Sequence, residues 1–294
     1  MRSNGISLCH FGMTVLIALF VTIVAHAQTA SPSPTPDASP SPEHEFLKYI
    51  LRDQKAIWTA PFHLKHDDMS WLAPIGIGTA ALIVTDQQTG DELAESHRQL
   101  NTSRVISYGG SVYGVAATAG AFYFIGRAAH NERARETGIL GAEALVDSAI
   151  LVTAIKEITQ RTRPSGGVSR SDFFDGGSSF PSGHSIEAWS LATVIANEYH
   201  SHRAVQIAAY GIASAVSISR FTGEKHYLSD VLVGGAMGFG IGRYVYRTHH
   251  RTAMSGGSEE DEDLSVEHGN RWPAIAPLFN GHAHSYGLGL GWSF

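Results

Sequence analysis

The chain has 294 residues, of which 43% are apolar, so it can bury a sizeable core in one large domain or two small ones. Its formal charge is −6 at pH 7 and it contains no long basic run, which excludes nucleic acid as an expected partner. The single cysteine, Cys9, lies near the start of the chain. Disulfide, thiolate-metal and thiol redox chemistry are therefore excluded for the remainder.

Residues 1–27 have the pattern of a secretory signal peptide. Arg2 precedes an uncharged apolar stretch from Met13 to Val24, and Ala25-His26-Ala27 fits the small-x-small pattern of an export cleavage site. This apolar stretch is short for a membrane span, which needs about 20 residues. We therefore expect cleavage after Ala27 and an exported protein, periplasmic or envelope-associated. The alternative is a retained membrane anchor.

Residues 28–45 alternate proline with small polar residues, which indicates an extended spacer without helix or strand. From Phe46 to about His250, apolar stretches of helical length alternate with short polar breaks. These stretches are rich in alanine and glycine and lack period-two alternation, which favours closely packed helices. We expect an all-α bundle over residues 46–250 with about six core helices, the clearest being Trp71–Val84, Val105–Ala129, Ile139–Ile158, Ser185–Tyr199, Ala204–Ser219 and Leu228–Tyr246.

The composition leaves two alternatives for the bundle, a soluble or peripheral protein and an integral membrane protein. The segment 105–126 runs 22 residues without a charge, but Glu143, Asp147, Glu187 and Asp230 interrupt other stretches. The mean hydropathy of the chain is −0.05, lower than expected for six spanning helices. These features favour the soluble or peripheral alternative.

Two segments follow the bundle. Residues 251–270 combine a Gly/Ser-rich hinge with an acidic run and predict a solvated tether. Residues 271–294 predict a β-hairpin tail, because a turn signal at Asn280-Gly281 precedes apolar residues that alternate with glycine or serine. The alternating residues are Tyr286, Leu288, Leu290, Trp292 and Phe294.

Polar residues cluster in SRFTGEKHYLSD, residues 219–230, between two apolar stretches. His226 and Asp230 are four residues apart, so they share one face if a helix begins near His226. The carboxylate could then hold the imidazole in one tautomer and orientation. Such a pair on its own is usually a surface pair, and its meaning depends on the segments that precede it.

Two upstream segments also carry polar residues at informative spacings. In FPSGHSIEAW, Ser182 is a candidate helix N-cap, and Gly183 lets a ligand approach free backbone N–H groups, which favours an anion. In KEITQRTRP, Lys156 and Arg163 are seven residues apart, two helical turns, and Pro164 marks the end of that helix. The spacing predicts two cations on one helix face.

Together, the three segments resemble the signature of the type 2 phosphatidic acid phosphatase and vanadium haloperoxidase superfamily. Every position is filled, and the third block alone would recur by chance at roughly one position in 10⁵. The signature spans residues 156–230, and the similar helix pattern extends over residues 46–250. The blocks are Lys156-x6-Arg163-Pro164, Pro181-Ser182-Gly183-His184 and Ser219-Arg220-x5-His226-x3-Asp230.

The resemblance implies a phosphate cradle made of three cations and two neutral donors. The cations would clamp the non-bridging phosphate oxygens, and the hydroxyl and amide would add hydrogen bonds. Such a cradle needs no metal and no other cofactor. Its members would be Lys156, Arg163, Ser182, Gly183 and Arg220.

The resemblance also implies the catalytic roles. His226, oriented by Asp230, would attack phosphorus and form a phosphohistidine, while His184 would protonate the leaving oxygen and later activate water. We expect an exported, metal-independent phosphatase acting on phosphate monoesters or lipid phosphates, with a membrane surface as a further partner. Histidines outside the signature are expected to lie at the surface, namely His249, His250, His282 and His284.

Three other functions stay open at this stage. In a vanadium-dependent haloperoxidase, His226 would ligate vanadate, although the 16 residues between Pro164 and Pro181 favour a compact phosphatase. An integral-membrane prenyl diphosphate phosphatase would use the same signature, and a non-catalytic envelope protein would keep only the anion cradle. In the loop 165–180, Phe173 and Phe174 could either accept a lipid tail or pack within the loop.

Overall fold

The structure is a computed structural model of the chain that describes residues 42–65, 68–91, 96–164, 171–250, 274–280 and 285–291. It divides into two compact units, residues 1–256 and 257–294, and the boundary falls inside the predicted tether. The predicted signal peptide, most of the predicted spacer and the whole of the segment 251–270 lie outside the described residues. Their predicted roles stay predictions.

The first unit is helical wherever it is described, which confirms the expected all-α class of the bundle. Its elements are α2 (Pro42–Thr59), the short 3-10 helix η1 (Ala60–Phe62), α3 (Met69–Asp91), α4 (His97–Gly109), α5 (Val112–Ala128), α6 (Glu132–Thr159), α7 (Gly183–Glu198), α8 (Arg203–Thr222) and α9 (Leu228–His249). In the second unit, the backbones of β1 (Ala274–Asn280) and β2 (Ser285–Gly291) pair antiparallel, with Ala274 opposite Gly291 and Asn280 opposite Ser285. The function of this tail stays a prediction.

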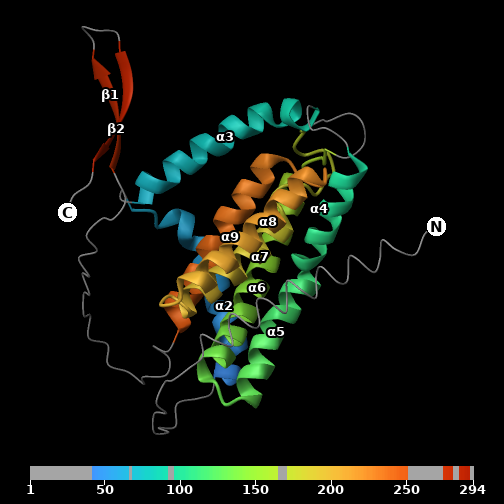
Figure 1. The fold of residues 1–294 in the computed structure, drawn as a ribbon, viewed down its shortest axis with the longest axis vertical. Helices are drawn as coiled ribbons and strands as arrows, with labels where there is room; N and C mark the ends of the chain where they lie inside the picture. Colours follow the sequence, from blue (N-terminus) through green and yellow to red (C-terminus); the bar gives the residue numbers. More distant parts are fainter. Residues whose placement is uncertain are drawn as a thin grey trace. The chain divides into compact units, whose positions relative to one another are not determined.

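Helix α7 is the central element of the bundle. It contacts α6, α8 and α9 along its length and also touches α5, while α2 packs on α6 and α3 on α9. Figure 1 shows α6, α7, α8 and α9 running side by side. All four of these helices have signature residues in their first or last turn, so their packing decides where those residues meet.

Several predicted boundaries are wrong. The stretch 105–129 is two helices, because Ser111 starts α5 by accepting a hydrogen bond from the Gly114 amide at 3.3 Å. Helix α6 begins seven residues before the predicted Ile139, where Asn131 Oδ1 caps the Ala134 amide at 2.9 Å. Helix α2 begins at Pro42, inside the predicted spacer, because proline is tolerated in the first turn of a helix. Local caps decided these boundaries.

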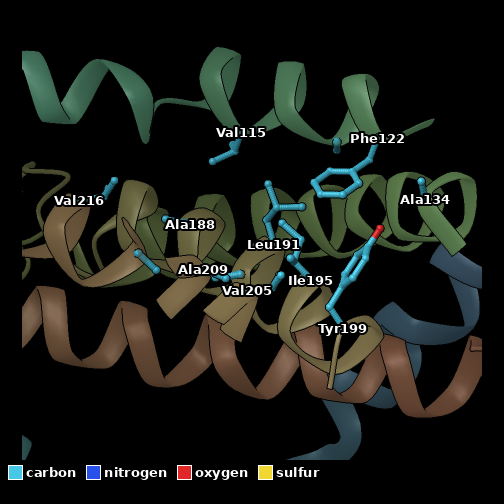
Figure 2. Packing of buried hydrophobic residues seen from close by; sticks show 13 residues of the cluster. Val115, Phe122, Ala134, Ala188, Leu191, Ile195, Tyr199, Val205, Ala209 and Val216 are labelled. Carbon is cyan, nitrogen blue, oxygen red and sulfur yellow. The ribbon is translucent and has the colours of Figure 1, made fainter. Parts of the chain in front are cut away.

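The largest apolar cluster lies between α5, α7 and α8. In Figure 2, Leu191 and Ile195 of α7 point toward Phe122 of α5, while Val205 and Ala209 of α8 lie on the other side of α7. A second cluster joins α6, α7 and α9. Because α7 contributes to both clusters, its position is fixed on two sides.

Helix α9 lies very close to α7 through three glycines spaced four residues apart. A Cβ atom at Gly234 would lie 2.6 Å from the Ser182 carbonyl oxygen, one at Gly238 would lie 2.2 Å from that of Ile186, and one at Gly242 would lie 2.3 Å from that of Ser190. These separations are shorter than any real Cβ contact, so the helix backbones touch along this face. The glycine-rich composition thus reflects close helix packing, as predicted.

Two helices are long and apolar enough to cross a membrane, by length and composition alone. They are α6 and α8 among the described residues, and 56% of the apolar window of α6 is buried inside the bundle, against 33% for α8. A buried core helix of a soluble protein passes the same test. Helix α8 also exposes large apolar side chains, including Ile207 and Ile218.

We predict that Gly238→Ala destabilises the protein by about 1–3 kcal/mol, because the added methyl group pushes α9 away from α7. Gly240→Ala is the matched control: it lies on the same helix, its Cβ would meet nothing within 4 Å, and alanine favours the helix by up to about 1 kcal/mol. Urea unfolding of both variants measures the difference. Equal stabilities would show that the α7–α9 contact is looser than described.

Candidate active site

The residues of the three signature segments come together at one end of the bundle. The last turn of α6 supplies Lys156, the first turn of α7 supplies His184, and the last turn of α8 supplies Arg220. The amide of Ser182 donates to the carbonyl of Asp230 at 3.0 Å, which ties the start of α7 to the first turn of α9. Segments separated by more than 40 residues therefore share one site.

Lys156 and Arg163 meet at Ser178, but not on one helix face as predicted. Helix α6 ends at Thr159, and Gln160 takes a left-handed conformation with φ 43°. The chain then turns, so that Lys156 Nζ donates to the Ser178 carbonyl and Arg163 donates to Ser178 Oγ at 3.2 Å. The two cations converge because the loop folds back, and the helical spacing is not the cause.

The N-terminus of α7 supplies the neutral donors. Ser182 is the N-cap residue, as predicted, but its hydroxyl does not cap the helix; it accepts a hydrogen bond from Ser185 Oγ at 3.1 Å. The first amides of the helix, which include that of Gly183, have no carbonyl partner within the helix. A Cβ at Gly183 would lie 4.0 Å from Lys156 Cε, so the glycine leaves the backbone open beside this cation.

The orientation of His226 is set mainly by Ser179. His226 Nδ1 lies 2.7 Å from the Ser179 carbonyl oxygen and 3.6 Å from Asp230 Oδ2. A carbonyl oxygen only accepts, so Nδ1 carries the proton and Nε2 carries the lone pair. His226 lies two residues before the start of α9 at Leu228, and its imidazole still faces the Asp230 carboxylate in the first turn of that helix.

Asp230 acts at the centre of a buried network that sequence reasoning missed. Its Oδ2 accepts from Ser179 Oγ at 2.5 Å and from the Tyr227 amide at 3.0 Å, and its Oδ1 accepts from Arg161 at 2.6 Å. Burial would raise the pKa of Asp230, but its contacts with His226, Arg161 and Ser179 hold that pKa below its usual value. The carboxylate therefore stays ionised and supports His226 both directly and through Ser179.

Arg161 is fully buried and binds several members of this network. One terminal nitrogen contacts Asp230 and Ser229 Oγ, and the other lies 2.8 Å from Asp86 Oδ2 on α3. The guanidinium also stacks between the rings of Phe173 and Tyr227, at 4.7 and 4.5 Å. Arg161 lies inside the quoted motif, but its partner Asp86 lies 75 residues earlier, where no motif identifies it.

The two histidines are neutral in the free site. Burial lowers the pKa of His226 to about 4, because its contact with Asp230 only partly offsets desolvation. Burial, together with repulsion from Arg220, His226, Arg163 and Lys156, lowers the pKa of His184 to about 3. Buried Arg220 Nε has no hydrogen-bond partner among the described residues. The site thus concentrates positive charge without matching acids, as an anion site requires.

The expectation of surface positions is wrong for His249 and holds only partly for His250. His249 is buried, with Nε2 3.0 Å from Asp53 Oδ1, and His250 is partly buried, with Nδ1 3.0 Å from both Glu136 and Glu198. The acids lie far away in the sequence, so no local spacing shows them. His282 and His284 lie outside the described residues.

We predict that substitution of the two arginines of QRTRP affects different properties, stability for Arg161 and activity for Arg163. Arg161→Ala leaves Asp86 and Asp230 buried without their cation and should destabilise the fold by about 3–5 kcal/mol. Arg163→Ala, at an exposed position, should change stability by less than about 0.5 kcal/mol while lowering phosphatase activity. Urea unfolding and turnover measured on the same samples separate the effects. A stable Arg161→Ala protein would contradict the role given to the network.

Comparison with known proteins gives three findings. Residues 137–253 match the PAP2 superfamily. A lipid A 1-phosphatase of Porphyromonas gingivalis is 31% identical over 135 residues, which cover 42% of this chain and 28% of the relative, so this chain spans under a third of that protein. A transmembrane PAP2-type phosphatidylglycerolphosphate phosphatase of Bacillus subtilis is 20% identical, covers 69% of this chain and 93% of its own, and has a TM-score of 0.40.

The matched segment contains all three signature blocks and most of the side chains that form the site. The family was expected from those blocks. Residues 137–253 are therefore similar to the PAP2 superfamily, in agreement with that expectation.

Proposed function

We propose that the chain is a metal-independent phosphatase that hydrolyses lipid phosphate monoesters through a phosphohistidine intermediate. The observation that carries the proposal is the state of His226: buried, neutral and fixed with its lone pair on Nε2, beside three cations and the N-terminus of α7. A lone pair on a fixed imidazole nitrogen is a nucleophile, and the cations bind the group that it attacks.

The first step would transfer the phosphoryl group to His226. Nε2 attacks phosphorus in line, a P–N bond forms, and the bond from phosphorus to the ester oxygen breaks. Lys156, Arg163 and Arg220 stabilise the charge on the non-bridging oxygens, which supplies the role that metal ions have in two-metal phosphatases. Asp230 and the Ser179 carbonyl stabilise the positive charge that the imidazole gains.

His184 would donate a proton to the leaving oxygen and then activate water for hydrolysis of the P–N bond. In the free site, three cations contribute to its low pKa, together with burial. A bound phosphate dianion neutralises those cations, which raises the pKa of His184 and makes its protonation favourable. Binding of the substrate would therefore favour the protonated form of His184, which is the form that donates a proton to the leaving oxygen.

Two observations support a lipid phosphate as the substrate. The named relatives are phosphatases of lipid A and of phosphatidylglycerolphosphate. In the loop beside the site, Phe173 packs on Arg161 and on Phe180, whereas the Phe174 side chain is 76% exposed. Phe173 thus packs within the loop, and the exposure of Phe174 supports the proposal that its side chain contacts an acyl chain at a membrane surface. Export of the chain stays a prediction.

We predict that phosphatidate in mixed micelles is hydrolysed with a kcat/KM at least about 10-fold above that of glycerol phosphate, because acyl burial adds binding energy. Activity should persist in excess EDTA at 25 °C and be inhibited by vanadate, which mimics the five-coordinate transition state. The rate of phosphate release is measured for each substrate and each inhibitor, and Phe174→Ser should reduce only the rate on phosphatidate. Activity lost in EDTA and restored by Mg²⁺, or bromide oxidation by the vanadate-loaded enzyme with peroxide, would overturn the proposal.

We predict that His226→Ala lowers turnover to background on every substrate, because it removes the nucleophile. His184→Ala removes a proton donor, typically worth about 10²–10⁴-fold, so its effect should shrink sharply on p-nitrophenyl phosphate, whose leaving group needs no proton. Rates on p-nitrophenyl and alkyl phosphates, with acid-quench trapping of labelled phosphoenzyme, test both roles. A phosphoenzyme in the His226 variant, or equal losses on both substrates for the His184 variant, would contradict them.

A further inference from the structure

A second cluster of buried polar groups joins α2, α6 and α9. Asp53 of α2, Glu143 of α6 and His249 of α9 each have less than a tenth of their surface exposed. His249 Nε2 lies 3.0 and 3.1 Å from the two Asp53 oxygens and 3.2 Å from Glu143 Oε1. One potential ligand atom from each residue lies within 4.8 Å of the other two.

This cluster is separate from the phosphate site. Glu143 precedes Lys156 by 13 residues on α6, which corresponds to about 20 Å along the helix axis. His249 is at the last turn of α9, whereas Asp230 is in its first turn. None of the three residues has a role in the phosphatase mechanism proposed above.

The cluster holds more acid than its hydrogen bonds can satisfy. Both carboxylate oxygens of Glu143 are buried without a hydrogen-bond partner among the described residues, and so is Oδ2 of Asp147, one turn further along α6. A fully buried carboxyl group that points at an imidazole already bonded to Asp53 lacks a positive partner.

The donor set fits a metal ion. Bonds of about 2.1 Å at tetrahedral angles separate ligand atoms by about 3.4 Å, close to the observed 3.0–3.2 Å between His249 and its two acids. One imidazole with carboxylates suits Zn²⁺ or Mn²⁺ better than Mg²⁺, which prefers oxygen ligands and retains water. Binding would release the protons held on His249 Nε2 and on the buried carboxyl groups, and the two carboxylates would then balance the divalent charge.

We propose that Asp53, Glu143 and His249 form a structural site for a divalent transition-metal ion, Zn²⁺ or Mn²⁺, which fastens α2 to α6 and α9. The site would strengthen the attachment of α2, which otherwise packs mainly on α6. It would stabilise the bundle without taking part in phosphoryl transfer. Metal content and catalysis are therefore measured independently.

The His250 cluster provides an internal comparison. It also has one histidine and two acidic residues, but there the imidazole lies 3.0 Å from both Glu136 and Glu198, whose hydrogen bonds raise the pKa of His250 to about 9. A protonated His250 thus supplies the positive charge itself. Glu136 and Glu143 lie two turns apart on α6, so the same substitution at each gives a matched pair.

The test is a metal titration of the purified full chain after chelator treatment and dialysis. Zn²⁺ and Mn²⁺ are added separately, binding is followed by competition with a chromophoric chelator, and stoichiometry is checked by plasma mass spectrometry. We expect one ion per chain and a Tm increase of about 5–10 °C when free metal is about 100 times Kd. Mg²⁺ at the same concentration should leave Tm unchanged.

Glu143→Gln keeps the side-chain shape, removes the ligand charge and should weaken binding by at least about 100-fold, with the Tm increase lost. Glu136→Gln should bind metal like the unmodified chain. Should Glu143→Gln not fold, Asp53→Asn is measured in its place. No bound ion and no Tm change with either metal would overturn the proposal, as would unchanged affinity in the ligand variant or equal losses in both glutamine variants.

The stripped chain should still hydrolyse phosphate esters at 25 °C, so failure of the phosphatase proposal would be seen separately.

Discussion

Arg161 carries a charge that has no contact with solvent, and the geometry of the candidate active site depends on how that charge is balanced. Two carboxylates from different helices, Asp86 and Asp230, meet the two terminal nitrogens of one guanidinium. The planar fork of arginine suits this arrangement, and a lysine ammonium could not span both acids with the same directions. Because Asp230 is fixed, Ser179 is fixed, and the imidazole of His226 is held by the Ser179 carbonyl. The imidazole of His226 is thus oriented by a buried network that Arg161 anchors.

The contact between α7 and α9 supplies the second constraint. The glycines of α9 allow the backbones to touch, and this contact begins at Ser182, where the anion site also begins. The same residue donates its amide to the Asp230 carbonyl. The contact between the two helices and the candidate anion site therefore share Ser182, and a change in the distance between the helices would move His184 relative to His226.

Buried charge is used in different ways at the two ends of α6 and α9. At one end, cations exceed acids and leave donors such as Arg220 Nε without partners, so an anion completes the site. Around His249, acids exceed cations and leave both carboxylate oxygens of Glu143 without a hydrogen bond among the described residues, so a cation would complete that site. Both arrangements follow from the penalty for burying unpaired charge, which a ligand of opposite sign removes. The two sites differ only in the sign of the missing partner.

The sequence by itself predicted the all-α class of the bundle, the similarity to the PAP2 superfamily and the residues that gather in the candidate active site, because these depend on local periodicity and on short motifs of fixed spacing. It did not determine helix boundaries such as that at Ser111, which rest on single capping hydrogen bonds. Only the tertiary structure decided what orients His226, what balances Arg161 and what surrounds His249. Their partners Ser179, Asp86 and Asp53 lie 47, 75 and 196 residues away. Contacts over such separations arise from the way whole helices pack, and no pattern within one segment encodes them.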